Sequence, residues 1–503
     1  MALKKTTHPL SIRNGDTPME HGIEGTRIVQ AKVWTLALAS LGSLMVALDM
    51  LVVTTALSTI RKDLGATMEQ LEWTVNAYSL TFAVLLMAAA AIGDRFGRRR
   101  MFATGIGLFA VASAACALAP TAAWLIAARV LQGVGAAMVM PLAMALLGAA
   151  YTGAARGRAL GIFSSITGLA VVAGPVVGGA IAGGMAWQWV FWLNVPIGAV
   201  AIALILTRMQ ESFGQRDAAL DVAGTLLVTG AALGVVWGLM RGNAAGWGSA
   251  EVLLSLAVGT VLAAAFVASE LRTALPMVPM RLFRSRQFVA GNAAGFLLYG
   301  SLYGAVFFVA QFLQVAQGHD PLEAGLRIIP WTGCAFVVAP ISGALVGRIG
   351  ERPLMVMGLL MQALGFGWIS LVAAPGLSYA QLVPPLVISG GVALAMPAAQ
   401  SAVMSAVAPS EVGKAAGVFN MLRQLGGVMS IAMLVAVFTT QGGLLDSAEA
   451  FSHGFAAAMG ACAALSLMGA LFAVLVPGRQ CKNQAVTAAP PRTPQTDVKA
   501  SAR

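Results

Sequence analysis

Apolar and polar positions occur along this chain in long blocks. Apolar runs recur from Val33 to Val476 with short polar joints between them, and a run of about 20 such residues crosses a bilayer as a helix. Barrel strands would show alternating patterns instead, and we find none. The pattern predicts an all-α membrane protein with 14 spans, at residues 33–57, 73–92, 101–119, 121–147, 159–184, 188–207, 220–240, 250–271, 288–315, 322–346, 354–374, 380–404, 413–439 and 453–477.

The segment Gly93–Arg100 fixes the predicted orientation of these spans. It carries five charges between two apolar runs, and its four arginines place it on the cytoplasmic side. Both termini are then cytoplasmic, and we expect disordered tails at residues 1–32 and 478–503. Of the 31 Lys and Arg residues, 25 become cytoplasmic, which supports the span count.

Composition excludes several classes of protein. The chain is 58% hydrophobic and only 10% charged, whereas soluble domains carry roughly 25% charge. The net charge of +11 sits in loops and tails beside apolar spans, so no nucleic-acid partner is expected. The four cysteines are far apart and suggest neither a disulfide framework nor a metal site. No HExxH sequence, serine–lysine pair or aspartate dyad occurs, so we expect neither an enzyme nor a cofactor.

Two short sequences recur at one offset. Gly135–Pro141 matches Gly391–Pro397, and Arg158–Phe163 matches Lys414–Phe419, both at an offset of 256. Such repeats are typical of transporters built from two parallel halves with a substrate site between them. The predicted organisation is a tail (1–32), a six-helix half (33–207), a linker with two inserted spans (208–286), a second six-helix half (287–477) and a tail (478–503).

Asp49 is the only carboxylate that the prediction places deep within a span. A charge at the bilayer centre costs about 2.5–3.5 kcal/mol, so this side chain should face the protein interior. Asp49 and Arg129 both fall in the outer half of the membrane, where they could pair. Movement between a paired and a buried environment would load and release a proton. A fixed structural ion pair is the alternative, and Gln132 either extends this polar face or bonds a neighbouring helix.

Arg423 is a second isolated charge within a span. Asn420 and Gln424 lie within one turn of it and form a polar stripe on one helix face. This stripe is interpreted either as part of a substrate cavity or as an arginine that extends to the cytoplasmic surface.

Other charged positions predict structural roles. Asp320–Glu323 is typical of a capping box, with proline at the first helical position. Glu323 then lies four residues before Arg327, which favours an ion pair along the helix. The two inserted spans carry no charge that we would place in the interior, and Asp221 is expected to cap the first of them.

Three motifs resemble those of the major facilitator superfamily. They are the loop Gly93–Arg100, the fourth-span sequence Arg129–Ala136 and the fifth-span sequence Gly174–Gly179, which is similar to the antiporter motif of exporters. Three further segments are similar to the fourteen-helix drug:proton antiporter family within it: Leu48–Val53, Trp73–Tyr78 and Trp187–Pro196. The resemblance covers about residues 33–477.

The resemblance implies roles for two groups of residues. The loop acts as a conformational latch through Gly93, Asp94, Arg95, Gly97, Arg98 and Arg99. Asp94 is expected to serve as an anion at a neighbouring helix N-terminus, near Gly413. The antiporter motif is a bent, closely packed helix made by Gly174, Pro175, Gly178 and Gly179. The alternatives are a loop that only sets topology and ordinary packing of small residues.

A lipophilic substrate cavity is predicted from aromatic and polar residues in the spans. Aromatic faces with one carboxylate suit lipophilic cations. The candidate residues are Asn76, Tyr78, Tyr303, Phe307, Gln311, Asn420 and Arg423. Ordinary packing or contact with lipid is the alternative for each.

We therefore predict a proton-coupled secondary transporter that exports lipophilic, cationic drugs or toxic compounds by alternating access. The alternative is a dedicated exporter or importer of a single metabolite on the same fold. The expected partners are a small-molecule substrate, protons and the lipid bilayer. We expect a monomer in a bacterial inner membrane.

Overall fold

The computed structural model describes residues 18–214, 221–273, 276–408 and 411–478. These residues are helical, with no strand in any described range. Fourteen helical segments among them are long and apolar enough to cross a membrane. The predicted all-α fold with 14 spans is confirmed. The two predicted disordered tails, 1–32 and 478–503, lie outside the described residues, except at residues 18–32 and 478.

The first six spans, which we call the N set, are formed by α1 (Pro18–Leu64), α2 (Met68–Phe96), α3 (Arg98–Ala117), α4 (Ala122–Ala150), α5 (Gly153–Gly184), α6 (Trp189–Trp192) and α7 (Asn194–Arg208). The inserted pair consists of α8 (Val222–Ala245) and α9 (Ala250–Arg272). The short helix η1 (Met280–Arg284) leads to the last six spans, the C set. They are formed by α10 (Arg286–Gln311), η2 (Phe312–Ala316), α11 (Pro321–Ile349), α12 (Glu351–Val372), α13 (Tyr379–Ser389), η3 (Gly390–Leu394), α14 (Ala395–Met404), α15 (Val412–Thr440) and α16 (Ala448–Val474).

Helix α1 begins much earlier than predicted. It starts at Pro18, inside the predicted disordered tail, and its membrane-compatible part begins at Gln30. Disorder was therefore the wrong expectation for residues 18–32. Extending an existing helix adds one hydrogen bond per residue without a new nucleation step, so the apolar span supports the polar turns that precede it.

Two predicted spans contain breaks in the regular α-helix. The ninth ends in the π-helical turn η2, and the twelfth is divided by the 3-10 turn η3. Glycine is a poor helix former, and Gly390 and Gly391 open η3. A side chain at Gly391 would also collide with Met361 of α12, so close packing requires glycine there.

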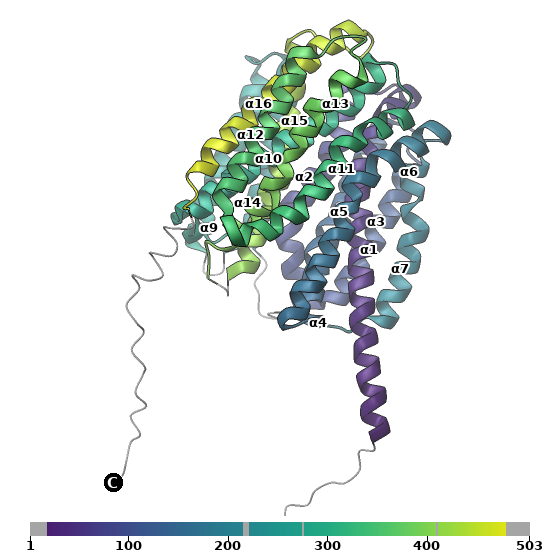
Figure 1. Cartoon of the computed structure of the whole chain (residues 1–503), viewed down its shortest axis with the longest axis vertical. Coiled ribbons are helices and arrows are strands. Elements are labelled where there is room, and N and C mark those ends of the chain that lie inside the picture. The colour runs from purple at the N-terminus through teal and green to yellow at the C-terminus, as the bar shows by residue number, and fades with distance from the viewer. Residues whose placement is uncertain (1–17, 215–220, 274–275, 409–410, 479–503) are drawn as a thin grey trace, which may run out of the picture.

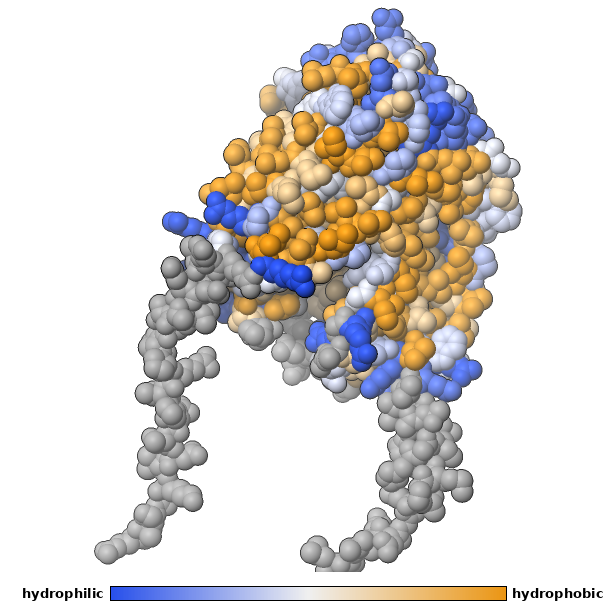
Figure 2. Space-filling model, in the orientation of Figure 1, coloured by the Kyte–Doolittle hydropathy of each residue, from blue (hydrophilic) through white to orange (hydrophobic). Residues whose placement is uncertain are grey.

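The N set and the C set pack side by side, with the inserted pair against both (Figure 1). Helices α8 and α9 pack mainly on each other, while α8 also contacts α2 and α15. The main contacts between the sets are α5 with α11 and α2 with α15. Figure 2 shows a broad apolar surface around the helices with hydrophilic residues gathered at the two ends. This is the surface that a multi-pass membrane protein presents to lipid.

Helices α5 and α11 of the two sets are in close contact at one end of the molecule. We call the end with the α2–α3 joint the basic face, and the end with the α1–α2 joint the far face. A Cβ at Gly183 would lie 3.5 Å from Leu322 N, so α5 and α11 meet near the far face. Toward the basic face, a Cβ at Gly168 of α5 or Gly343 of α11 would have no neighbour within 4 Å. The contact between α5 and α11 is therefore closest near the far face, whereas α2 and α15 touch toward the basic face, where a Cβ at Gly417 would lie 3.2 Å from Met87.

Candidate functional site

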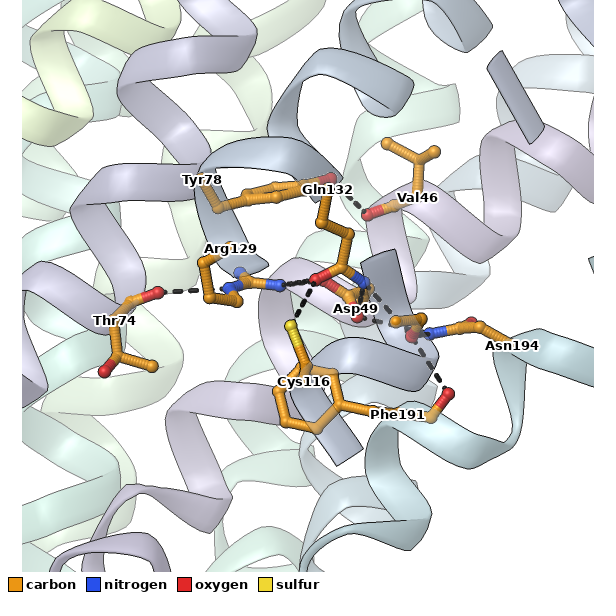
Figure 3. Close-up of polar contacts among 10 residues, drawn as sticks. Val46, Asp49, Thr74, Tyr78, Cys116, Arg129, Gln132, Phe191 and Asn194 are labelled. Carbon is orange, nitrogen blue, oxygen red and sulfur yellow. Dashed lines mark hydrogen bonds and ion pairs between the residues drawn. The ribbon is translucent and has the colours of Figure 1, made fainter. Parts of the chain in front are cut away.

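Asp49 of α1 and Arg129 of α4 form a buried ion pair. The carboxylate oxygen Oδ2 of Asp49 contacts Nη1 of Arg129, and the two residues are 2% and 1% exposed. The pair that the sequence made possible is therefore formed (Figure 3). Its role in proton coupling stays a prediction.

The other hydrogen-bonding atoms of this pair are also engaged. Asp49 Oδ1 accepts from Gln132 Nε2 at 2.8 Å and from Asn194 Nδ2 at 3.2 Å. Arg129 donates to Gln132 Oε1 at 2.7 Å and to the Thr74 carbonyl at 3.1 Å. These groups surround the pair in Figure 3. A buried ion pair is tolerated only when such bonds satisfy its remaining donors and acceptors.

The network extends to a third layer of residues. The guanidinium carbon of Arg129 lies 4.2 Å from the centre of the Tyr78 ring, a cation–π contact. Ser113 of α3 accepts from Asn194 Nδ2 at 3.0 Å and donates to the Phe191 carbonyl at 2.9 Å. One charge pair therefore connects α1, α2, α3, α4 and the α6–α7 segment. A change in the charge of Asp49 acts on all of these elements.

An apolar recess reaches Asp49 from the side of α5 and α7. Asp49 and Asn194 are its polar residues, and Leu44, Leu48 and Leu193 are among the apolar ones. The recess lies beside the carboxylate, whose side chain is itself completely buried. A second, smaller cavity lies between the two sets, where α1, α5, α10 and α11 meet beside Pro175 and Trp331.

Sequence reasoning missed Asn194 as a partner of Asp49 and Ser113 as a partner of Asn194 and Gln132. Asn194 lies within the Trp187–Pro196 motif that carried the family resemblance, so a signal was present. Ser113 is one small polar residue in an alanine-rich span, and nothing in its spacing separates it from a packing residue.

The predicted latch residues form a compact cluster at the basic face. Asp94 Oδ1 pairs with Arg98 Nε at 2.7 Å. Gly97 has a φ of 107°, a conformation that favours glycine. Gly93 is buried, and a Cβ there would collide with Leu142. Arg95 is exposed and lies over the Phe96 ring.

Glu211, which the sequence analysis missed, is the main anion at this turn. Its carboxylate accepts the backbone N–H of Arg99 at 2.8 Å and of Arg100 at 3.3 Å. An anion at the first turn of a helix is stabilised by the free N–H groups there, so Glu211 caps α3. The recorded partner of the Asp94 carboxylate is Arg98 in its own turn rather than the start of α15. The latch contacts described here therefore lie within the N set and the segment that follows α7, and none of them reaches the C set.

The antiporter-motif residues lie at the junction of three helices. A Cβ at Gly174 would lie 2.6 Å from Leu51 Cβ, and one at Gly178 would lie 2.6 Å from the Val52 carbonyl, so both face α1. A Cβ at Gly179 would collide with the Pro321 carbonyl of α11. In turn, a Cβ at Gly325 of α11 would collide with the Pro175 carbonyl. The motif therefore brings α5 close to both α1 and the C set.

The predicted cavity residues lie in several environments. Asn76 is buried, and Tyr78 packs on Arg129 while donating to the Val46 carbonyl at 3.1 Å. Phe307 is fully buried in the apolar core. Gln311 bonds within its own helix, to the Phe307 carbonyl. These residues are not brought together around one open cavity in this conformation.

The remaining candidates lie on α10 and α15. Tyr303 donates to Gln424 Oε1 at 3.3 Å. Asn420 bonds within its own helix, to the Ala416 carbonyl. The guanidinium of Arg423 lies 5.2 Å from the Tyr299 ring centre. The stripe on α15 therefore faces α10 within the C set.

One expectation about buried charge is wrong. Glu72 of α2 is 1% exposed and Glu270 of α9 is 3% exposed, so two further carboxyl groups are buried near helix ends and the inserted pair does carry one of them. Helix α2 begins at Met68 rather than near residue 73, which brings Glu72 into the span. Glu270 accepts the Val278 N–H at 2.9 Å, a partner from the following joint that helical spacing does not predict.

The charges near the start of α11 form the predicted local cluster. Asp320 Oδ1 accepts from the backbone N–H of Glu323 at 2.9 Å, with Pro321 at the first helical position. Arg327 pairs with Glu323 Oε1 at 2.6 Å. The predicted helix start and ion pair are confirmed in these contacts.

The chain belongs to the major facilitator superfamily, whose family model matches residues 39–431. It is 35% identical to the methylenomycin A resistance protein of Streptomyces coelicolor, over 92% of this chain and 96% of that protein. It is 34% identical to the tetracenomycin C resistance and export protein of Streptomyces glaucescens, over 82% and 78% of the two chains. It is also 35% identical to the multidrug resistance protein Stp of Mycobacterium tuberculosis, over 81% and 76%.

Solved transporter structures share the fold. A D-xylose–proton symporter superposes with a TM-score of 0.65 at 14% identity, covering 89% of this chain and 98% of that one. A bacterial homolog of the human lysosomal transporter Spinster, in an inward-facing conformation, gives a TM-score of 0.63 at 17% identity, covering 89% and 97%. The protein is thus a membrane transporter of this superfamily rather than an enzyme.

Proposed function

We propose that this protein exports lipophilic, cationic drugs or toxic compounds in exchange for protons, with Asp49 and Arg129 in the coupling step. The observation that carries the proposal is the buried Asp49–Arg129 pair beside a recess, in a chain whose relatives are named for drug and antibiotic resistance. Intramembrane ionisable residues mark proton and substrate pathways in membrane proteins.

The pair can couple proton binding to movement for a simple electrostatic reason. When Asp49 is ionised, the pair has no net charge, and both Asp49 oxygens and the Nε and Nη1 of Arg129 are hydrogen-bonded. Protonation of Asp49 would leave the Arg129 guanidinium as a buried cation without a counter-charge, and breaking such a pair costs about 3–5 kcal/mol. A conformation that gives Arg129 water or a new partner then becomes favoured. Binding a proton thereby shifts the conformational equilibrium.

The glycine contacts support a matching conformational step. Helices α5 and α11 approach closely near the far face and separate toward the basic face. We infer that the basic face is cytoplasmic, with both termini on that side, so α5 and α11 diverge toward the cytoplasm in the conformation described here. The N set and the C set would act as the two halves predicted at residues 33–207 and 287–477. We place the protein in a bacterial inner membrane as a monomer.

A dedicated exporter of one antibiotic or metabolite is the second candidate. The specific observation in its favour is that two relatives are named for single compounds, methylenomycin A and tetracenomycin C. The first of these aligns over nearly the whole of both chains. A narrow substrate profile would distinguish this candidate from a multidrug exporter.

The test is ethidium efflux from energised cells that lack other pumps, with and without a protonophore. Wild type is compared with Asp49→Asn at matched membrane expression. Asp446→Asn is the control, because Asp446 forms an exposed ion pair with Arg61 at the far face. We expect efflux to collapse in Asp49→Asn and in uncoupled cells and to persist in the control. Normal efflux by Asp49→Asn contradicts the coupling role, and no ethidium efflux by wild type favours the dedicated exporter.

A further inference from the structure

Glu72 is an interior carboxyl group without a counter-charge. It lies on the second turn of α2 and is 1% exposed. Within the described ranges it forms no ion pair, and its recorded hydrogen bond is a long one of 3.4 Å from Asn76 Nδ2. Asp49, by contrast, contacts an arginine and two amides. The two carboxyl groups of α1 and α2 are therefore in opposite electrostatic situations.

The residues beside Glu72 add further acceptors. Asn76 and Ser79 follow it at spacings of four and three residues, so the three side chains share one face of α2. Asn76 Oδ1 and Ser79 Oγ are buried, and neither has a hydrogen-bond partner in the part of the chain that is described. This face therefore offers oxygen acceptors that lack a donor.

The same face of α2 is turned toward the C set. Ala83, one turn beyond Ser79, belongs to the apolar cluster that includes residues of α10 and α15. Nearby, a Cβ at Gly417 of α15 would touch Met87 of α2. The other side of α2 contacts Arg129 through Thr74 and Tyr78. Helix α2 thus separates the Asp49–Arg129 pair from the face that carries Glu72.

Charged groups near this face are already engaged elsewhere. Glu69, one turn before Glu72, pairs with Arg241 of α8 at 3.4 Å. Arg129 is paired with Asp49 on the other side of α2. Arg423 of α15 lies over the Tyr299 ring of α10. Within the described part of the chain, none of these three arginines forms an ion pair with Glu72.

We propose that Glu72, with Asn76 and Ser79, binds one positive charge on the face of α2 that is turned toward the C set. The charge is a proton when no substrate is bound, and it is the cationic group of a transported compound when one is bound. An ionised carboxylate buried without a cation would cost several kcal/mol, so Glu72 is a neutral acid while no cation is bound. The acceptors beside it suit a cation that carries N–H donors.

This inference rests on the proposed function, and in it Asp49 and Glu72 have different roles. Asp49 has its partners within the N set, and its protonation shifts the conformational equilibrium. Glu72 determines which charge the transported compound must carry. When a cation binds, the Glu72 carboxyl releases its proton to water and keeps the electron pair as a carboxylate. Proton and cation therefore compete for one oxygen pair, which is the requirement for exchange.

The experiment measures binding to purified full-length protein in detergent. The probes are ethidium, which is permanently cationic and has N–H donors, and Nile red, which is neutral. Glu72→Gln is compared with wild type, and Glu69→Gln is the matched control one turn away. Calorimetry in two buffers of different ionisation enthalpy counts the protons released. Glu72→Asp, which keeps the charge, provides a second variant in case the amide variant fails to fold.

We expect wild type and Glu69→Gln to release about one proton per ethidium bound. Glu72→Gln should release fewer protons and bind ethidium at least roughly tenfold more weakly, with Nile red binding unchanged. Glu72→Asp should retain proton release. If wild type binds ethidium and Glu72→Gln binds it equally well, this inference is wrong while the proposed function stands. If wild type binds Nile red but no ethidium, the cationic substrate class fails and this inference fails with it.

Discussion

The N set and the C set share a helical plan but differ in chemistry at matched positions. At the repeat offset of 256, Arg129 corresponds to Pro385 and Gln132 to Ile388. The N set has a buried charge network at this level of its fourth span, whereas the C set has a proline and an apolar side chain.

Aromatic packing dominates the C set instead. The rings of Phe312 and Phe455 stack with centroids 4.2 Å apart. Phe308 and Phe438 lie 5.2 Å apart, and both are almost completely buried. Such contacts stabilise a helix interface without any ionisable group.

The comparison indicates that the fold does not require the ion pair. The C set arranges six spans without an equivalent arginine, and replacing a buried ion pair by well-packed apolar residues is often neutral or stabilising. The network around Asp49 therefore calls for a functional explanation. The predictions below test whether the N set and the C set differ in function as they differ in their packing and charge.

The largest effect is expected from Arg129→Ala. Removal of the guanidinium leaves Asp49 buried without a counter-charge, which should lower the free energy of unfolding by about 3–5 kcal/mol. Thermal unfolding in detergent measures the loss. Asp49→Asn/Arg129→Ala should recover part of this stability but no transport. Equal stability of Arg129→Ala and wild type would contradict the account of the pair.

The contact between the sets is tested by Gly179→Val. The new side chain would meet the Pro321 backbone of α11, and overpacking of this kind costs about 1–3 kcal/mol. The closed far face should lose population by roughly 5–150-fold, which slows efflux. Gly184→Val is the control, because a Cβ at Gly184 has no neighbour within 4 Å. Similar efflux rates in both variants would contradict the claim that the contact between Gly179 and Pro321 stabilises the closed far face.

A smaller effect is expected from Glu211→Gln. The carboxylate that caps α3 becomes a neutral amide, and the interaction with the helix N-terminus is worth about 0.3–2 kcal/mol. Faster trypsin cleavage at Arg98–Arg100 would report a loosened turn. Glu449→Gln, at the first turn of α16 in the C set, should leave that cleavage rate unchanged. If both variants are cleaved at the wild-type rate, Glu211 does not stabilise the turn that contains Arg98–Arg100.

The smallest effect is expected from Phe312→Leu in the C set. Loss of the stacked pair with Phe455 should reduce stability by about 0.5–1.5 kcal/mol beyond the lost apolar area. The pH dependence of efflux should stay that of wild type, because no charged group changes. A shifted pH profile would show that the C set also takes part in coupling.

Much of the fold could be predicted because apolar run length and arginine placement are direct consequences of the bilayer. The Asp49–Arg129 pair could be anticipated because few charges lie inside the spans. Glu72 was missed because it directly precedes an apolar run. The sequence does not distinguish a polar residue there that lies in water from one that lies in the buried first turns of the helix. Glu211 and Asn194 were missed because their partners lie 112 and 145 positions away in sequence. Only tertiary packing brings such pairs together.

The most direct test of the account is transport by purified protein in liposomes. Wild type and Asp49→Asn are compared in two assays with ethidium: exchange without a proton gradient, and uptake driven by an imposed gradient. The account predicts that Asp49→Asn retains exchange and loses the gradient-driven uptake, because the carrier still moves but no longer binds the coupling proton. Gradient-driven uptake at the wild-type level in Asp49→Asn would contradict it.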